Sequence, residues 1–220
     1  MSVAQLAIAV FARTPVAGQA KTRLIPALGP EGAARLQGQL IARALARAQA
    51  VAPNDTWLWL TGAHLDLPCD AAVKRVWQVG EHLGARMTHA FAQMLPESEA
   101  VIVIGTDCPA QRAQDLRQAA RALETADAVF QPALDGGYVL VGLHHRVLRD
   151  EPERWPQLFA QIAWGSEAVY AQTQARLIET GLRAAALPAR PDLDWPQDYV
   201  QAVEAGWIDS VNQAVGPHSC

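Results

Sequence analysis

The sequence predicts an α/β domain in which helices cover both faces of a mostly parallel central sheet. Apolar runs typical of strands alternate along the chain with stretches in which apolar residues recur every three or four positions, as they do in helices. Residues 100–104 form a continuous, largely β-branched run, which is typical of a buried parallel strand. Half of the 220 residues are hydrophobic and no repeat or linker divides them, so we expect one domain over residues 1–220.

The elements before this central strand are predicted from their apolar patterns. Residues 6–11 form a short apolar run, which is expected to be the first strand. A helix is expected to begin at Pro30, which suits a first turn, and to end near residue 51. Residues 57–60 and 73–79 are rich in β-forming side chains and are predicted strands, and residues 82–94 are predicted to be helical.

A helix and a hairpin are expected after the central strand. Pro109 opens a loop or helix that is predicted to run to about residue 125. Residues 128–132 and 138–143 are predicted strands, because both are apolar and the segment between them carries the turn signal Asp135-Gly136-Gly137.

The last part of the chain returns to alternating elements. Residues 146–165 are rich in Trp, Pro and charge, and are expected to be irregular. A helix is predicted at 166–180 and ends at Gly181, which suits a C-terminal cap. A final strand at 183–187 and a final helix that ends near residue 205 complete the fold.

Charge and cysteine content exclude several classes of function. Lys and Arg number 18 against 22 acidic residues, so the chain lacks the basic field of a nucleic-acid-binding protein. The longest apolar runs are too short to cross a bilayer and no signal peptide is evident, so we expect no membrane partner and a cytoplasmic location. Cys69, Cys108 and Cys220 lack metal-type spacing and are expected to be free thiols of a reducing compartment.

A loop between the first strand and the first helix gathers groups that suit a phosphate. It contains Gly18, Thr22 and the cationic residues Arg13, Lys21 and Arg23, and free backbone N–H groups with positive charge form a phosphate cradle. The spacing matches neither a Walker A loop nor a dinucleotide fingerprint. We predict that these five residues bind the phosphates of a nucleotide; the alternative is a set of cations that only solvates the loop.

Carboxylates follow two of the predicted strands. Asp107, beside Thr106, comes directly after the central strand, where ligands of open α/β sheets bind. Asp192 and Asp194 follow the last strand. Because Mg²⁺ and Mn²⁺ prefer oxygen ligands, we predict that Asp107, Asp194 and Asp192 hold one of these ions. The alternative is that these residues cap the helices that follow them.

The turn Asp135-Gly136-Gly137-Tyr138 has two compatible interpretations. It is a good hairpin signal, and its glycines also allow a ligand to approach the backbone closely. Asp135 is suited to hold a hydroxyl of an acceptor or a sugar. We therefore predict three catalytic residues, Asp107, Asp135 and Lys21, and additional nucleotide contacts from Thr106, Gly136, Gly137 and Tyr138.

Five motifs occur in order along nearly the whole chain, and together they resemble a known family. They are the phosphate loop 11–24, Gly84-Ala85-Arg86-Met87, Gly105-Thr106-Asp107-Cys108-Pro109, Asp135-Gly136-Gly137-Tyr138 and Asp192-Leu193-Asp194. The set resembles the GT-A-like nucleotide-diphospho-sugar transferases of the arsenosugar-biosynthesis type, which are related to the guanylyltransferases of molybdenum-cofactor and 2-phospho-lactate metabolism. The resemblance implies a Rossmann-like GT-A fold.

The resemblance also implies roles for individual residues. Lys21 and Arg23 match the phosphate-contacting loop of the family, Asp107 matches its metal-binding aspartate, and Asp192 with Asp194 matches its closing acidic motif. The chain departs from the family's usual residues at Ala85, Ala110, Gln111 and Trp195. These departures concern base or acceptor specificity more than phosphate chemistry.

The sequence therefore predicts a metal-dependent glycosyltransferase that uses a nucleotide-diphospho-sugar donor and a small-molecule acceptor. A divalent ion on Asp107, shared with Asp194, is expected to neutralise the diphosphate, while Lys21 and Arg23 stabilise the leaving group. The acceptor is expected near Asp135. One alternative is a nucleotidyltransferase that binds a nucleoside triphosphate and releases pyrophosphate, and another is a non-catalytic nucleotide-binding protein.

Overall fold

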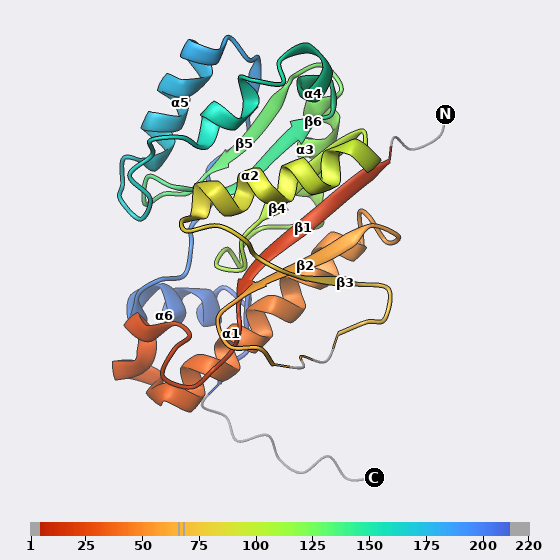
Figure 1. The fold of residues 1–220 in the computed structure, drawn as a ribbon. Helices are drawn as coiled ribbons and strands as arrows, with labels where there is room; N and C mark the ends of the chain where they lie inside the picture. Colours follow the sequence, from red (N-terminus) through yellow and green to blue (C-terminus); the bar gives the residue numbers. More distant parts are fainter. Residues whose placement is uncertain (1–4, 66, 68, 212–220) are drawn as a thin grey trace.

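One twisted sheet forms the centre of the molecule (Figure 1). The structure is a computed structural model and describes residues 5–65, 67 and 69–211. Within these residues, seven strands lie in the order β3-β2-β1-β4-β6-β5-β7. The strands are β1 (Leu6–Arg13), β2 (Thr56–Thr61), β3 (Lys74–Trp77), β4 (Ala100–Ile104), β5 (Ala128–Pro132), β6 (Tyr138–His144) and β7 (Ala184–Ala186).

The sheet is mostly parallel, as predicted. β1 pairs in parallel with both β2 and β4, β2 pairs in parallel with β3, and β5 pairs in parallel with β7. Only β6, among the strands of the described chain, is antiparallel to its neighbours β4 and β5. This reversal follows from the predicted hairpin, because a short turn can join only antiparallel strands.

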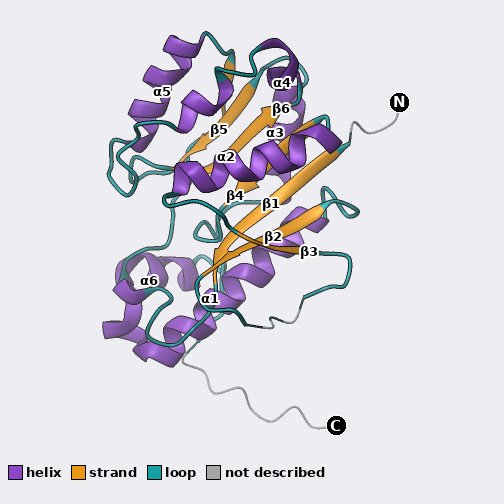
Figure 2. Cartoon of the chain, in the orientation of Figure 1, coloured by secondary structure: helices purple, strands orange, loops and turns teal. Residues whose placement is uncertain are grey.

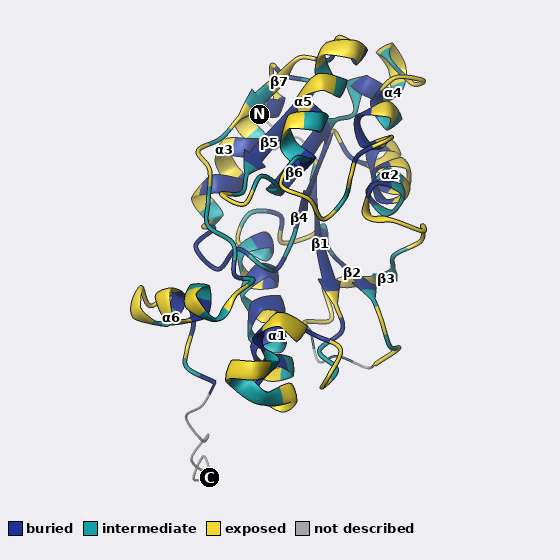
Figure 3. Cartoon of the chain, turned by 90° about the vertical axis from the view of Figure 1, so that its left-hand side faces the viewer, coloured by how far each residue is buried: buried dark blue, intermediate teal, exposed yellow. Residues whose placement is uncertain are grey.

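Helices cover both faces of the sheet, which confirms the predicted α/β class (Figures 2 and 3). Alternate side chains of a strand point to opposite faces, and in β1 Ala7, Ala9 and Phe11 pack with α2, whereas Ile8 and Val10 pack with α1 and α3. α4 and α5 lie on the α2 side. The helices are α1 (Ile25–Gln49), α2 (Leu83–Met94), α3 (Ala113–Leu123), α4 (Arg146–Asp150), α5 (Val169–Thr180) and α6 (Pro196–Glu204), with 3₁₀ turns η1 (Thr22–Leu24), η2 (Leu95–Glu97) and η3 (Trp155–Phe159).

Helix starts differ from the prediction for identifiable reasons. α1 includes an extra turn before Gly29, whose φ of +70° interrupts the helical backbone immediately before the predicted start at Pro30. α3 begins at Ala113 rather than near Pro109, because the Asp115 carboxylate accepts a hydrogen bond from the Arg112 N–H at 2.8 Å and caps the helix.

The segment 146–165, predicted to be irregular, contains α4 and η3. The elements form because their apolar side chains reach the core: Trp155, Leu158 and Phe159 are buried, and Phe159 stacks on Phe91 with ring centroids 5.7 Å apart. Tertiary burial therefore imposes local order that the sequence pattern does not predict.

The thiol prediction holds for the cysteines that the structure describes. Cys69 and Cys108 are free, and burial raises the pKa of Cys108 to about 11, which keeps this thiol protonated. Cys220 lies outside the described residues. No helix in the described ranges combines the length and apolar character that crossing a membrane requires.

The β5–β6 turn depends on Gly136. Its φ is +91°, and a Cβ atom at this position would lie 2.0 Å from the carbonyl oxygen of Glu167. We expect Gly136→Ala to lower the free energy of unfolding by about 2–4 kcal/mol, because backbone strain and a clash with rigid backbone add together. Urea unfolding measures this loss.

Gly181→Ala is the matched control. Gly181 has a similar positive φ of +70°, but a Cβ there would meet nothing within 4 Å. We expect this variant to lose only about 1 kcal/mol, from backbone strain alone. Equal losses of unfolding free energy in the two variants would show that the backbone of Glu167 moves to accommodate the added Cβ atom.

The topology brings three distant segments to one edge of the sheet. β1 and β4 are parallel neighbours, so the loops that follow Arg13 and Ile104 emerge side by side. The segment before α6 lies against them, because the Leu193 N–H donates to the Asp107 carbonyl oxygen at 2.7 Å. The carboxyl end of β1 lies next to α1 and α6 in Figure 1.

Candidate functional site

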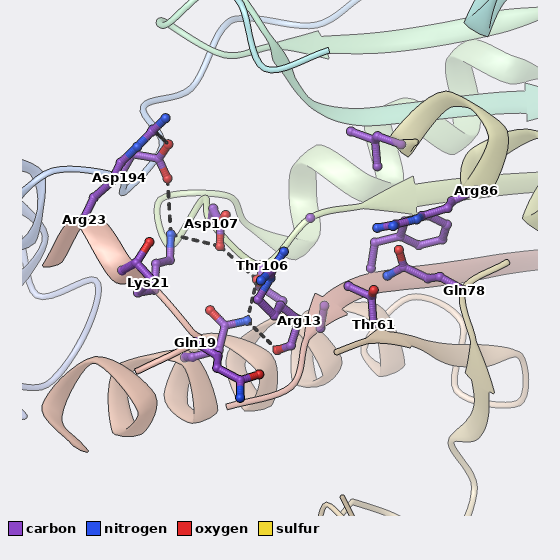
Figure 4. A pocket seen from close by; sticks show the side chains of 16 residues that line it. Arg13, Gln19, Lys21, Arg23, Thr61, Gln78, Arg86, Thr106, Asp107 and Asp194 are labelled. Atoms are coloured by element: carbon purple, nitrogen blue, oxygen red, sulfur yellow. Dashed lines mark hydrogen bonds and ion pairs between the residues drawn. The ribbon is translucent and has the colours of Figure 1, made fainter. Parts of the chain in front are cut away.

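A cleft of about 540 Å³ opens at the carboxyl ends of β1 and β4 (Figure 4). It is lined by the loop after β1, the turn after β4, residues of α2 and the segment before α6. The structure brings together seven of the residues that the sequence predicts for the site: Arg13, Lys21, Thr22, Arg23, Thr106, Asp107 and Asp194.

Lys21 lies between the two carboxylates of this cleft. Its Nζ is 3.0 Å from Asp107 Oδ1 and 3.4 Å from Asp194 Oδ1, and it also donates a hydrogen bond to the carbonyl oxygen of Leu193. Only 6% of the Lys21 side chain is exposed. The Lys21 backbone has a φ of +46°, an uncommon conformation for a residue with a side chain. The backbone of Lys21 is therefore locally strained, and its buried ammonium group lies between the carboxylates of Asp107 and Asp194.

Asp107 is held in place by its neighbours. Thr106 Oγ1 donates to Asp107 Oδ1 at 2.9 Å, and Gln37 Nε2 donates to Thr106 Oγ1 at 3.4 Å and to the Arg13 carbonyl oxygen at 3.0 Å. Half of the Asp107 side chain remains exposed to the cleft. Because α3 is capped by Asp115, the alternative that Asp107 caps this helix is wrong. Its carboxylate is oriented by hydrogen bonds and available to a ligand.

Asp194 is likewise directed into the cleft. Arg23 Nη1 lies 2.7 Å from Asp194 Oδ2, and the Arg23 guanidinium lies over the Trp195 ring at 5.0 Å from its centroid. The N-terminus of α6 is capped by Asp198, whose carboxylate accepts hydrogen bonds from the N–H groups of Trp195 and Asp194. The alternative that Asp194 caps this helix is therefore wrong.

A second cavity of about 210 Å³ adjoins the cleft. The two share Arg23, Leu83 and Asp194 as lining residues. The predicted turn residues Asp135, Gly137 and Tyr138 line this second cavity and not the cleft, together with Trp164. The structure thus separates the predicted residues into two connected spaces.

Tyr138 contributes ring surface to the second cavity. Its ring meets Trp164 edge to face with centroids 6.4 Å apart, and its hydroxyl lies 4.0 Å from the sulfur of Met87. Burial raises the pKa of Tyr138, so the phenol stays protonated at neutral pH. Tyr138 therefore shapes the cavity and carries no charge into it.

Asp192 lines neither cavity, unlike Asp107 and Asp194, with which the prediction grouped it. It is partly buried, and the charges of Asp135 and Asp194 act on its carboxyl group. No cluster of three or more His, Cys, Asp or Glu side chains that could hold a metal occurs among the described residues. Of the three predicted metal ligands, only Asp107 and Asp194 form an ion pair with Lys21.

The pKa of Asp192 is raised from 3.8 to about 6, mainly by burial and further by the charges of Asp135 and Asp194. The folded protein consequently binds more protons than the unfolded chain between about pH 4 and pH 6, so the Asp192 contribution to stability falls as pH rises through this window. We expect Asp192→Asn to remove this loss. Its free energy of unfolding, relative to that of the parent, should rise between pH 4.5 and pH 7.

Urea unfolding of both proteins at the two pH values measures the difference. Asp209→Asn is a suitable control, because Asp209 is an exposed partner of Arg43 and lines neither cavity. A difference between parent and Asp192→Asn that does not change with pH would contradict the raised pKa of Asp192.

Two predicted glycines line neither cavity. Gly18 is exposed in the loop after β1, where its φ of +78° favours glycine and no atom lies within 4 Å of a Cβ built there. Gly136 packs against the backbone of Glu167. The structure therefore gives both glycines a role in loop geometry.

Five polar residues of the cleft are absent from the predicted set: Gln19, Gln37, Thr61, Gln78 and Arg86. Gln37 interrupts the apolar stripe of α1 and is only 3% exposed, and a polar residue on a buried helix face is a signal that sequence reasoning can use. Arg86 belongs to a motif that the resemblance includes, but only its position at the start of α2 shows that it faces the cleft.

The middle part of the chain matches a known protein family. Residues 41–166 match the model of a family described as "Uncharacterized protein conserved in bacteria" (DUF2064). Comparison with curated proteins gave no match.

Solved structures share the fold over nearly the whole chain. One, from Desulfovibrio desulfuricans G20, carries a provisional assignment as a nucleotide-diphospho-sugar transferase; it is 27% identical, covers 98% of this chain and 92% of its own, and has a TM-score of 0.82. A nucleotidyl transferase from Methanothermobacter thermautotroptrophicus is 16% identical over 91% and 97% of the two chains, with a TM-score of 0.62. The 2-C-methyl-D-erythritol 4-phosphate cytidylyltransferase from Thermus thermophilus is 13% identical over 93% and 100%, with a TM-score of 0.57.

Proposed function

We propose that this chain is a nucleotide-utilising transferase. It belongs to the DUF2064 family and shares its fold with transferases that use nucleotides. We propose further that it moves a glycosyl group from a nucleotide-diphospho-sugar to a small-molecule acceptor and requires Mg²⁺ or Mn²⁺. The observation that carries this proposal is the placement of the Lys21 ammonium between the carboxylates of Asp107 and Asp194.

The charge of the cleft suits a diphosphate. Arg13, Arg23, Arg86 and Lys21 line it, against the two carboxylates of Asp107 and Asp194. The guanidinium groups offer planar pairs of donors to phosphate oxygens, whereas the ammonium of Lys21 acts as a compact point charge. The excess of positive charge favours an anionic ligand in this space.

The donor set fits a hard divalent cation. Mg²⁺ is commonly bound by one or two carboxylates and completes its shell with water and substrate phosphates. Asp107 and Asp194 would hold the ion, and their carboxylates already enclose the positive charge of Lys21. When bound, the ion would neutralise charge on the diphosphate.

The proposed reaction balances without a further reactant. The bond between the anomeric carbon of the sugar and the diphosphate oxygen breaks, and the nucleoside diphosphate leaves with the electron pair. A hydroxyl oxygen of the acceptor bonds to that carbon, and its proton passes to water or to the departing nucleoside diphosphate. Lys21 and Arg23 stabilise the charge that develops on the leaving diphosphate, because both lie in the cleft with fixed orientation.

Nucleotidyl transfer is the second candidate, and the fold similarity to a nucleotidyl transferase and a cytidylyltransferase favours it. In that reaction an acceptor oxygen attacks the α-phosphate of a nucleoside triphosphate, and pyrophosphate leaves. The product distinguishes the two reactions, because glycosyl transfer releases a nucleoside diphosphate.

A panel of nucleotides and nucleotide-sugars, with and without Mn²⁺, tests the proposal by thermal stabilisation. A ligand that binds only the folded protein raises its apparent stability, so we expect a nucleotide-sugar to raise Tm and Mn²⁺ to increase the effect. Chromatography then identifies the released product. Release of pyrophosphate from a nucleoside triphosphate would show that the reaction is nucleotidyl transfer and not glycosyl transfer. If calorimetry shows that neither Mn²⁺ nor Asp107→Ala changes nucleotide affinity, the chain is a non-catalytic nucleotide-binding protein.

A further inference from the structure

The two connected cavities have opposite charge. Four cationic side chains and two carboxylates line the cleft, whereas the second cavity is lined by Arg23, Asp135 and Asp194. Arg23 is already engaged, because its guanidinium pairs with Asp194 at 2.7 Å and lies over Trp195. The second cavity therefore keeps one uncompensated carboxylate, that of Asp135.

Asp135 makes no ion pair with any residue that the structure describes. Its Oδ1 accepts a hydrogen bond from the Gly137 N–H at 2.9 Å, and this bond holds the carboxylate at the turn. Glu167, on the neighbouring loop, is exposed and also acidic. Among the side chains that line this cavity, none offers an anionic group a cation that is not already paired, whereas Asp135 repels such a group.

Apart from Ser166 and two glycines, the remaining lining is apolar or aromatic. Leu83, Val169, Tyr138 and Trp164 surround the cavity, and the Tyr138 hydroxyl is directed to Met87. An aromatic surface beside one carboxylate suits the apolar face of a sugar or polyol whose hydroxyls donate hydrogen bonds, or a compound with an ammonium group.

We propose that the second cavity selects an acceptor without phosphate or carboxylate: a neutral or cationic compound with hydroxyl or amino groups, which donates a hydrogen bond to Asp135. This inference rests on the proposed function, since it takes the cleft as the nucleotide side of the reaction. It also separates this chain from transferases whose acceptor is a phosphorylated compound.

A pair of engineered thiols tests the charge of each cavity without turnover. Ser166→Cys places a thiol in the second cavity and Gln19→Cys places one in the cleft, and both native residues are exposed. The background carries Cys69→Ser and Cys220→Ser, while Cys108 is 2% exposed. Cationic and anionic methanethiosulfonate reagents of similar size are compared, each normalised to its rate with a free small thiol.

We expect Ser166→Cys to react at least about fivefold faster with the cationic reagent, and Gln19→Cys to show the opposite preference. Adding Asp135→Asn to Ser166→Cys should reduce the cationic preference at least about twofold. An anionic preference at position 166, or a preference that Asp135→Asn does not change, would overturn the inference.

Matched acceptors test the selection itself. Glycerol is compared with glycerol 3-phosphate, and glucosamine with glucosamine 6-phosphate, at saturating nucleotide-sugar and Mn²⁺. We expect the compound without phosphate to stimulate release of nucleoside diphosphate at least about tenfold more than its phosphorylated partner. A preference for the phosphorylated member of a pair overturns the inference.

These experiments distinguish failure of the proposed function from failure of the proposed acceptor selectivity. If no nucleotide stabilises the protein, the proposed function falls, whatever the relative rates of the cationic and anionic reagents with the engineered thiols. If nucleotides bind and the thiol at position 166 prefers the anionic reagent, only the inference about the acceptor falls.

Discussion

Lys21→Met is expected to weaken the binding of a nucleoside diphosphate by about 1–3 kcal/mol, which corresponds to roughly 5- to 150-fold in affinity. The variant keeps the length of the side chain and removes its charge. The loss is large because Lys21 is the most enclosed cation of the cleft, with 6% of its side chain exposed and three oxygen partners. Calorimetry in the presence of Mn²⁺ measures it.

Lys74→Met is the control, because the chain contains only these two lysines. Lys74 pairs with Asp55 at 2.8 Å and lies over the Trp57 ring, away from the cleft. Its replacement should leave nucleotide affinity within about twofold of the parent, as expected for a surface ion pair. Equal effects of the two substitutions would remove Lys21 from the site.

Asp107→Asn is expected to lower turnover at least about 100-fold and to abolish the increase in nucleotide affinity that Mn²⁺ produces. Asparagine has nearly the same shape, so Thr106 and the Leu193 N–H can keep their places around it. What the variant loses is the charge that a divalent cation requires. Initial rates and calorimetry, each with and without Mn²⁺, measure the two effects.

The folded state provides the check on this variant. Because half of the Asp107 side chain is exposed, the substitution should leave the urea midpoint close to that of the parent. Turnover that survives with undiminished dependence on Mn²⁺ would show that the ion, if required, is held elsewhere.

Local sequence patterns predict much of this architecture. The strands predicted at 100–104 and 128–132 have the same bounds in the structure, because a continuous apolar run and a hairpin signal are both local features. The loop after β1 and Asp107 after β4 also lie where the predicted strands place them, at the edge of the sheet that forms the cleft. Gly181 has the left-handed conformation expected of a helix cap.

Other features have no local signal. The apolar core orders 146–165 through the burial of Trp155 and Phe159, and no periodicity in that segment predicts it. The division of predicted residues between two cavities is also a tertiary result, since Asp135 and Asp107 both follow predicted strands and differ only in where those strands lie.

The sequence by itself determined that the chain is an α/β protein with a cationic loop after its first strand and a carboxylate after its central one. These are properties of short segments, governed by side-chain periodicity and turn chemistry. Only the tertiary structure decided that Asp194, and not Asp192, meets Lys21 opposite Asp107. Lys21 and Asp194 are 173 positions apart, and the sheet order and the hydrogen bond from Leu193 to Asp107 set the distance between them.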